Sequence, residues 1–291
     1  MILARHLPDK KGLHLSHGPI DLIISVTAQT GTHEQAALRA ATERFDGLLE
    51  ELVEELPLLR TPIDKVPHQP AGPIARRMAV AVAPHAGRFF ITPMAAVAGA
   101  VAEEVLSAMM AAARLDRAFV NNGGDIAFHL IPGCSFAVAL AGLDGHRFGD
   151  VTITGDMPVR GIASSGRGGR SHSLGIADNV TVFAASAAAA DAAATLIANA
   201  VDLPGHAAVK REPADSLSPD TDLGDRPVVV GRGYLTEAEV NAALTPGAVL
   251  AEEMRRNGWI EAAGLFLSGQ SRLVANPALR KGGMERRHID A

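Results

Sequence analysis

Residues 119–128 read FVNNGGDIAF, and this stretch decides how the fold is interpreted. One apolar run enters it and another leaves it, separated by two glycines and the carboxylate of Asp125. Adjacent glycines adopt backbone angles that other residues avoid, so the stretch fits a tight turn between two strands, for which Asn-Gly is a common signal. The same glycines would also let the backbone approach a ligand closely, with Asp125 adding a charge. Taken alone, the stretch favours the hairpin.

A second glycine-rich turn follows at residues 163–172, which read ASSGRGGRSH. Backbone N–H groups near Ser165 and Gly166, together with Arg167 or Arg170, could hold a pyrophosphate, the arginines binding in bidentate fashion. A flexible surface loop with solvated arginines is an equally good interpretation. Because two such turns occur, the sequence predicts a site for an anionic, phosphate-bearing small molecule.

His172 is the best candidate for a general base, because it lies in the second turn between two serines. His129 and His146 are weaker candidates, since a lone histidine near an apolar strand is more often structural. Cys134 is the only cysteine, which rules out an internal disulfide and fits a reducing compartment. The sequence also lacks zinc-like histidine spacing, a Walker motif and the GxSxG motif of serine hydrolases.

Asp191 is a charge embedded in alanines, in a stretch that reads AAAADAAAT from residue 187 to residue 195. Thr195 follows Asp191 at i+4, so a helix would place the carboxylate and the hydroxyl on one face. Such oxygen ligands suit Mg²⁺, which often shares its coordination with substrate phosphates. The simpler alternative is that Asp191 faces water and is stabilised by the helix dipole.

The composition narrows the class of protein. A chain of 291 residues with 47% apolar and only 4% aromatic residues buries its core largely with alanine and valine. Its net charge of −5 gives no support for nucleic acid or an acidic membrane surface as a partner. The amino terminus lacks the apolar core of a signal peptide, and residues 94–113 include acids and many alanines, so we expect a cytoplasmic protein with no membrane partner.

Strands grouped with unevenly placed helices predict an α+β fold with mainly antiparallel sheets, forming a single domain over residues 1–291. Residues 206–226, rich in proline and aspartate, are expected to form a mobile loop. The predicted strands are residues 20–28, 89–92, 118–120, 126–131, 136–141, 151–154, 159–163, 180–184, 260–267 and 272–274. The predicted helices are residues 33–56, 94–114, 187–201, 236–244 and 248–257, whereas residues 76–83 fit either a helix or a buried strand.

Three blocks resemble motifs of the ApbE-like superfamily, whose best-known members are FAD:protein FMN transferases. Residues 121–126 look like its Asn-x-Gly-Gly-Asp-Ile turn, residues 162–166 like its Ala-Thr-Ser-Gly segment, and residues 190–195 like its Ala-Asp-Ala-x-Ala-Thr helix. Residues 92–100, which read TPMAAVAGA, resemble a branch of the superfamily with no assigned activity. This likeness spans about residues 18 to 275.

The resemblance implies an ApbE-like (T-fold-like) fold with long alanine-rich helices, a ligand such as FAD or FMN, and Mg²⁺. It assigns Asp191 and Thr195 to the metal and places Asn122, Gly123, Gly124 and Asp125 in the flavin nucleotide pocket. The site would lie between the glycine-rich turns and the Asp191 helix.

Two family features are missing. Gly99 stands where the transferases carry a lysine, and their His-His-Ile-Ile-Asp-Pro block is absent. The resemblance as a whole implies an Mg²⁺-dependent flavin transferase with an acceptor protein, or an FAD pyrophosphate hydrolase, whereas the two missing features favour proteins without this activity. The alternatives are a non-catalytic flavin or nucleotide binder and a scaffold module. A homodimer is the favoured assembly.

Overall fold

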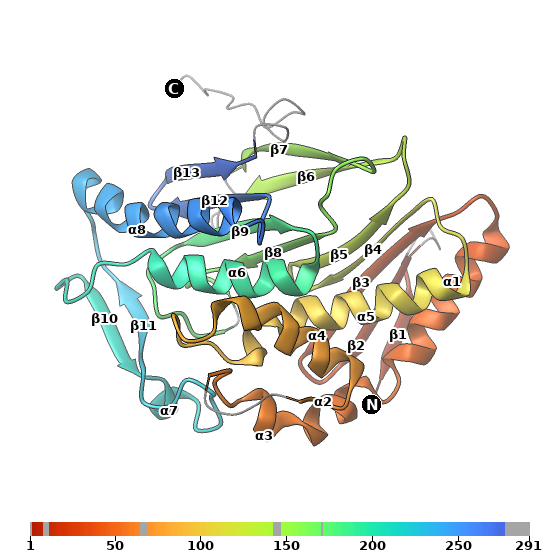
Figure 1. Ribbon diagram of the computed structural model, residues 1–291, viewed down its shortest axis with the longest axis horizontal. Helices are drawn as coiled ribbons and strands as arrows, with labels where there is room; N and C mark the ends of the chain where they lie inside the picture. Colours follow the sequence, from red (N-terminus) through yellow and green to blue (C-terminus); the bar gives the residue numbers. More distant parts are fainter. Residues whose placement is uncertain (1, 8–11, 65–68, 142–146, 170, 277–291) are drawn as a thin grey trace. The chain divides into compact units, whose positions relative to one another are not determined.

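In the computed structural model, the described residues are 2–7, 12–64, 69–141, 147–169 and 171–276 (Figure 1). The chain divides into two compact units. Unit 1 comprises Met1–Phe136, Thr154–Ala163 and Ala184–Ala192, and unit 2 comprises Ala137–Ile153, Ser164–Phe183 and Ala193–Ala291. Helix α6 (Ala187–Ala200) belongs to both, because the division falls inside it.

Unit 1 contains antiparallel strands in the order β1-β2-β3-β4-β5-β8. In β3 the buried side chains of Leu22 and Ile24 alternate with partly exposed ones, because successive side chains of a strand point to opposite faces. The bounds of these strands are β1 (Leu3–His6), β2 (Gly12–His17), β3 (Ile20–Thr27), β4 (Arg117–Asn122), β5 (Asp125–Leu130) and β8 (Gly161–Ser165).

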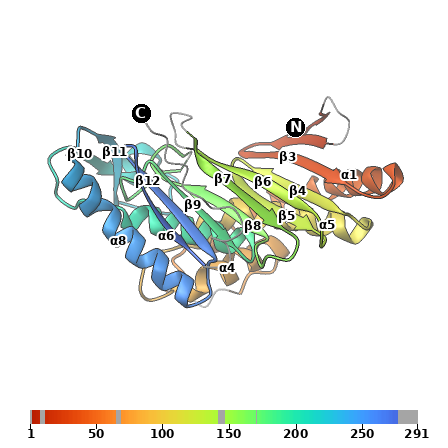
Figure 2. The same ribbon diagram turned by 90° about the horizontal axis from the view of Figure 1, so that it is seen from above.

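Helices α1 and α5 pack on one face of these strands, as Figures 1 and 2 show. The helix expected over residues 33–56 is interrupted, because the chain turns at Asp46 and Gly47. The undecided residues 76–83 are helical, and the strand expected at residues 89–92 is wrong, since Ile91 only accepts a loop hydrogen bond from the N–H of Ile63 (3.1 Å). The helical elements are α1 (Gly31–Phe45), α2 (Leu48–Glu54), α3 (Leu56–Leu59), α4 (Pro73–Val82), η1 (Ala83–His85), η2 (Pro93–Ala96) and α5 (Val97–Ala112).

An ion-pair network joins the helices of unit 1. Arg44 of α1 binds Glu51 of α2 (2.7 Å) and Glu104 of α5 (3.0 Å). Arg77 of α4 binds Glu104 (3.1 Å) and Glu103 (3.3 Å). The two α5 acids are 13% and 15% exposed, so loss of a partner would leave a largely buried charge without its counter-ion.

The stretch Pro93–Ala112 is long and apolar enough to cross a membrane by length and composition. Buried helices of other proteins pass the same test, and 44% of its most apolar window is buried inside the protein. Its α5 part packs against β4, β5 and α1, which is the environment of a core helix.

Unit 2 contains the end of β8 followed by β9, β12 and β13. The strands β9, β12 and β13 pair antiparallel, and α8 packs along β12 and β13 (Figure 2). Two further strand pairs, β6 with β7 and β10 with β11, form separate two-stranded sheets. The bounds are β6 (Ser135–Ala141), β7 (Arg147–Thr154), β9 (Asn179–Ala184), β10 (Val209–Pro213), α7 (Ala214–Leu217), β11 (Pro227–Arg232), α8 (Glu237–Arg256), β12 (Ala262–Leu267) and β13 (Gln270–Ala275).

The α+β class is confirmed, but two expectations for unit 2 are wrong. The region 206–226, expected to be a loop, contains β10 and α7, because β10 pairs with a strand that the sequence pattern did not indicate. The two helices expected at 236–244 and 248–257 are one helix, α8, with Pro246 inside it. Buried residues on both sides of Pro246, such as Leu244 and Leu250, hold the helix continuous despite the lost hydrogen bond.

Candidate functional site

The first glycine-rich turn is a hairpin between β4 and β5. Asn122 pairs with Asp125, and Gly123 and Gly124 between them have φ of 65° and 115°. The N–H of Gly124 donates to Oδ1 of Asn121 at 2.8 Å. The turn interpretation of this stretch is therefore correct, and the turn also fixes Asp125 at the start of β5.

Asn122 is 4% exposed and its amide is used inside the protein. Its Nδ2 donates to the carbonyl oxygen of Ala98 (3.2 Å), and its Oδ1 accepts from the N–H of Asp21 (3.4 Å). Asn122 thus ties the hairpin to β3 and to the amino-terminal end of α5. Its assignment to a cofactor stays a prediction.

Asp191 caps the amino-terminal end of α5 from the neighbouring helix α6. Its Oδ2 accepts from the N–H of Gly99 at 3.0 Å. In the reverse direction, Oε1 of Glu103 on α5 accepts from the N–H of Ala188, in the first turn of α6, at 2.8 Å. Each helix therefore supplies a carboxylate to the N–H groups that the other leaves unsatisfied, an arrangement that also suits both helix dipoles.

The two helices cross in very close contact at Gly99. A Cβ atom on Gly99 would lie 2.3 Å from the carbonyl oxygen of Ala187, and one on Gly161 would lie 2.2 Å from the N–H nitrogen of Ala187. No side chain fits at position 99, the position that the sequence comparison matched to the lysine of the flavin transferases. The glycine of the TPMAAVAGA stretch is explained by this crossing.

The carboxylates of Asp125 and Asp191 act on each other within unit 1. Burial raises the pKa of Asp191 well above its usual range, and the nearby charge of Asp125 raises it further, while the N–H groups of Gly99 and Ala98 oppose the shift. Asp191 nevertheless keeps part of its surface open to solvent. Two like charges held together in this way favour a bound proton or a bound cation.

Thr195 lies one helical turn after Asp191 on α6. Asp191, Thr195 and Asn199 form the partly exposed polar stripe of a helix whose other residues are mostly buried. The predicted pairing of carboxylate and hydroxyl on one face therefore holds as helix geometry. Among the described residues no cluster of three or more histidine, cysteine or acidic side chains is arranged to hold a metal.

The second glycine-rich turn lies in unit 2, after Ser165 at the end of β8. Gly166 has φ of 148°, and Arg167 donates from Nε to Oδ1 of Asp178 at 3.3 Å. Arg170 lies outside the described residues. His172 is exposed and makes no hydrogen bond within the described part of the chain, so its role as a base stays a prediction.

Neither of the two weaker histidine candidates is supported as a catalytic base. His129 bonds through Nε2 to the carbonyl oxygen of Leu115 (3.1 Å), a structural contact, and His146 lies outside the described residues.

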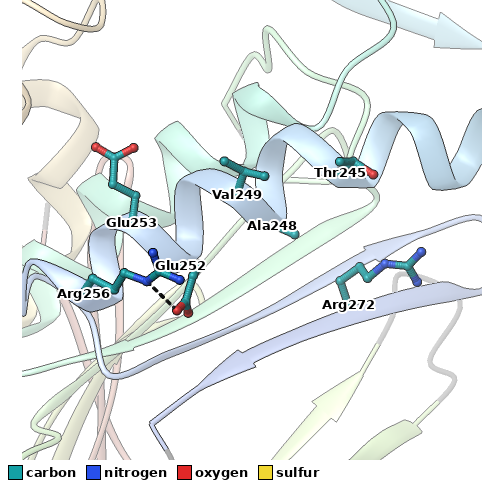
Figure 3. A pocket seen from close by; sticks show the side chains of 7 residues that line it. All are labelled: Thr245, Ala248, Val249, Glu252, Glu253, Arg256 and Arg272. Carbon is teal, nitrogen blue, oxygen red and sulfur yellow. Dashed lines mark hydrogen bonds and ion pairs between the residues drawn. The ribbon is translucent and has the colours of Figure 1, made fainter.

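A separate hollow of about 580 Å³ lies between α8 and β13 in unit 2 (Figure 3). It contains none of the residues singled out from the sequence. Glu252 is paired with Arg255 and Arg256, and Val249 is 64% exposed at its wall. Its lining residues are Thr245, Ala248, Val249, Glu252, Glu253, Arg256 and Arg272.

Three residues that organise these regions were not recognised from the sequence as part of a site. The roles of Glu103 and Asp178 depend on partners far along the chain. Gly99 was noted only for the missing lysine. The run of small residues around Gly99 was the one local signal that a second helix packs there.

Fold and site together define an α+β protein with a pair of interacting carboxylates beside a glycine hairpin. A family model described as AbpE bacteria matches residues 4–273, and the chain belongs to this family. The resemblance to an ApbE-like branch drawn from the motifs is thereby confirmed.

The chain is also similar to archaeal proteins named UPF0280 protein. It is 34% identical over 197 residues to the one from Methanothrix thermoacetophila, covering 62% of this chain and 74% of that protein. It is 31% identical to the one from Methanococcoides burtonii, covering 72% and 86%. The match to the Methanopyrus kandleri protein is 42% identical but spans 43% of this chain and only 48% of the relative.

Solved structures of ApbE proteins show a more distant similarity. The ApbE protein from Thermotoga maritima matches with a TM-score of 0.48 and 11% identity, covering 94% of this chain and 99% of that one. The flavin transferase ApbE from Vibrio cholerae matches with a TM-score of 0.43 and 11% identity, covering 96% and 100%.

Proposed function

We propose that this protein binds FAD together with Mg²⁺ and breaks the FAD pyrophosphate, either transferring FMN to an acceptor hydroxyl or releasing it by hydrolysis. The observation that carries the proposal is the pair of interacting carboxylates, Asp125 and Asp191, beside the open Gly124 turn. Membership of the family and the motif resemblance to flavin transferases supply the choice of FAD.

The chemistry of the donor set fits Mg²⁺. This ion is bound in many proteins by one or two carboxylates, with waters and substrate phosphates completing its coordination. Asp125 and Asp191 would hold it, with the hydroxyl of Thr195 one turn further along α6. When bound, the ion would neutralise charge that develops on the phosphate oxygens.

The proposed reaction forms one phosphorus–oxygen bond and breaks another. In either reaction an oxygen of water or of an acceptor hydroxyl forms a bond to the flavin-side phosphorus. The phosphorus–oxygen bond to AMP breaks, and AMP leaves with that electron pair. The proton of the attacking hydroxyl must pass to a base; His172, the base predicted from the sequence, belongs to unit 2, and its part in this step stays a prediction.

A non-catalytic nucleotide binder is the second candidate. It is favoured by the exposed position of His172, which no hydrogen bond from another described residue orients, and by the crossing at Gly99 that excludes a lysine. This candidate predicts FAD binding that persists without Mg²⁺ and no product on long incubation.

The test is incubation of the purified protein with FAD and Mg²⁺, with and without EDTA, followed by chromatography of the nucleotides. The proposal expects FMN and AMP only when Mg²⁺ is present. Asp191→Asn keeps an oxygen to accept from the N–H of Gly99 but removes a charge, and should lower turnover about 100-fold. Asp215→Asn, at an exposed acid of unit 2, is the matched control.

Equal turnover of the Asp191→Asn and wild-type proteins would refute the metal role of this residue. FAD that stays intact but elutes with the protein would support the binder instead.

A further inference from the structure

The carboxylate of Asp178 accepts hydrogen bonds from three donors in separate parts of unit 2. It lies just before β9, and its Oδ1 accepts from Nε of Arg167 (3.3 Å) and from Nη2 of Arg232 (2.9 Å). Its Oδ2 accepts from the backbone N–H of Ser268 (2.7 Å). With both carboxylate oxygens occupied, the carboxylate is held in one orientation.

The two arginines differ in which of their guanidinium nitrogens are already bonded within the protein. Arg232 is 10% exposed, and its second Nη donates to the hydroxyl of Ser268. Both Nη groups of Arg232 are therefore already bonded within the protein. Arg167 is 34% exposed, and within the described residues only its Nε is engaged. The cluster of two guanidinium groups and one carboxylate carries a formal charge of +1.

The backbone fixes Arg167 against the same segment. The N–H of Arg167 donates to the carbonyl oxygen of Ala177 at 2.9 Å. A Cβ on Gly166 would lie 2.7 Å from the carbonyl oxygen of Asp178, so only glycine allows this approach. The turn closes with a bond from the N–H of Gly169 to the carbonyl oxygen of Gly166 (3.0 Å).

We propose that Asp178 is a positioning residue that holds Arg167 by its Nε, so that the edge formed by the two Nη groups faces solvent and binds a phosphate group in bidentate fashion. A guanidinium anchored at Nε keeps this second edge free, and planar bidentate binding of phosphate is the geometry for which arginine is suited. That the phosphate belongs to a nucleotide such as FAD rests on the proposed function; the phosphate site itself does not.

The test is calorimetric titration of the full chain with inorganic pyrophosphate in EDTA, which leaves the metal chemistry out. Arg167→Lys keeps the charge but loses the planar guanidinium that can bind phosphate through two N–H groups. This change should raise the Kd about 10-fold, the equivalent of one charged hydrogen bond. Asp178→Asn should weaken binding by a similar factor. The double variant should bind no more weakly than either single variant, because both changes remove the same contact. Arg256→Lys, at a 73% exposed arginine of α8, is the control and should leave the Kd unchanged.

The direction of the Asp178→Asn effect separates positioning from simple charge. Removal of a carboxylate makes the cluster more positive, so charge alone would tighten pyrophosphate binding. Tighter or unchanged binding would overturn the proposal. If Asp178→Asn does not fold, a wild-type Kd for Arg167→Lys overturns it equally, as does the absence of pyrophosphate binding to the wild-type protein. Weakened binding in both variants would support the site even if FAD is never cleaved, an outcome that would remove only the proposed reaction.

Discussion

Replacement of Gly99 by alanine is the sharpest test of the helix crossing that forms the carboxylate pair. The new Cβ would lie 2.3 Å from the carbonyl oxygen, 2.5 Å from the carbonyl carbon of Ala187 and 2.7 Å from the N–H nitrogen of Ala188. These are backbone atoms that cannot rotate away, so the cost should reach the upper end of the roughly 1–3 kcal/mol typical of overpacking. Alanine recovers about 1 kcal/mol through its helix propensity. The net loss in free energy of unfolding is therefore about 2 kcal/mol.

The assay is urea unfolding followed by circular dichroism, with thermal unfolding as a second measurement. With an unfolding entropy of about 2.1 cal/mol/K per residue, a loss of about 2 kcal/mol lowers the Tm of this 291-residue chain by roughly 3 °C. Gly31→Ala is the matched control, because Gly31 begins α1 and its Cβ position is open: apart from its own helix backbone and chain neighbours, no atom of the described residues lies within 4 Å. That variant should be as stable as the wild type or about 0.4–1 kcal/mol more stable. Equal stability of the two variants would refute the close crossing.

Three further changes test the energetics of unit 1. Asp191→Asn should unfold at a higher temperature than wild type at pH 8, because burial and Asp125 raise the pKa of Asp191. The native state then binds the extra proton, so wild-type stability falls as pH rises from the usual aspartate pKa to the raised value. Thermal unfolding across pH 4–8 should show the advantage of the variant growing with pH; an advantage confined to acid would contradict it. Burial lowers the pKa of His85 to about 4, so its neutral form contributes about 3 kcal/mol above pH 6.5, lost as pH falls towards 4. His85→Gln should remove that part of the acid sensitivity in urea unfolding, and an unchanged pH profile would argue against it. Glu104→Gln leaves Arg44 and Arg77 with a weaker partner and should cost about 1–3 kcal/mol in the same assay, whereas a neutral result would mean that the network adds no stability.

The elements that follow local rules could be predicted from the sequence. The hairpin at Gly123 and Gly124 has a two-residue turn signal between apolar runs, and α6 has a long alanine-rich pattern. Both depend on residues that are neighbours in the chain. Residues 89–92 have the residue types of a strand, yet within the described part of the chain no strand pairs with them, and they do not form one. The β10–β11 pair shows the reverse, since a polar segment becomes a strand because β11 supplies its partner.

The same distinction between local signals and long-range contacts applies to the candidate site. Asp125 and Asp191 were recognised as residue types in a motif, but neither the cap on α5 nor the interaction between the two carboxylates could be read from the sequence, because 92 positions separate Gly99 from Asp191. Arg167 was recognised as a cation in a glycine-rich turn. Its partner Asp178 was not, because the convergence of Arg232 and Ser268 on that carboxylate depends on how β9, β11 and β12 come together.

The energetics of Asp191 separate its two roles. As a cap for α5 it needs only an oxygen that accepts the N–H of Gly99, and an asparagine would supply one without a buried charge next to Asp125. The ionised carboxylate therefore makes the fold less stable than a neutral cap would at neutral pH. Folding alone gives no reason for a charge at this position, whereas a cation bound by both carboxylates would turn the unfavourable interaction into a favourable one. The Asp191→Asn variant should accordingly become more stable and less active at once, and a variant that loses both properties would show that the carboxylate serves the fold.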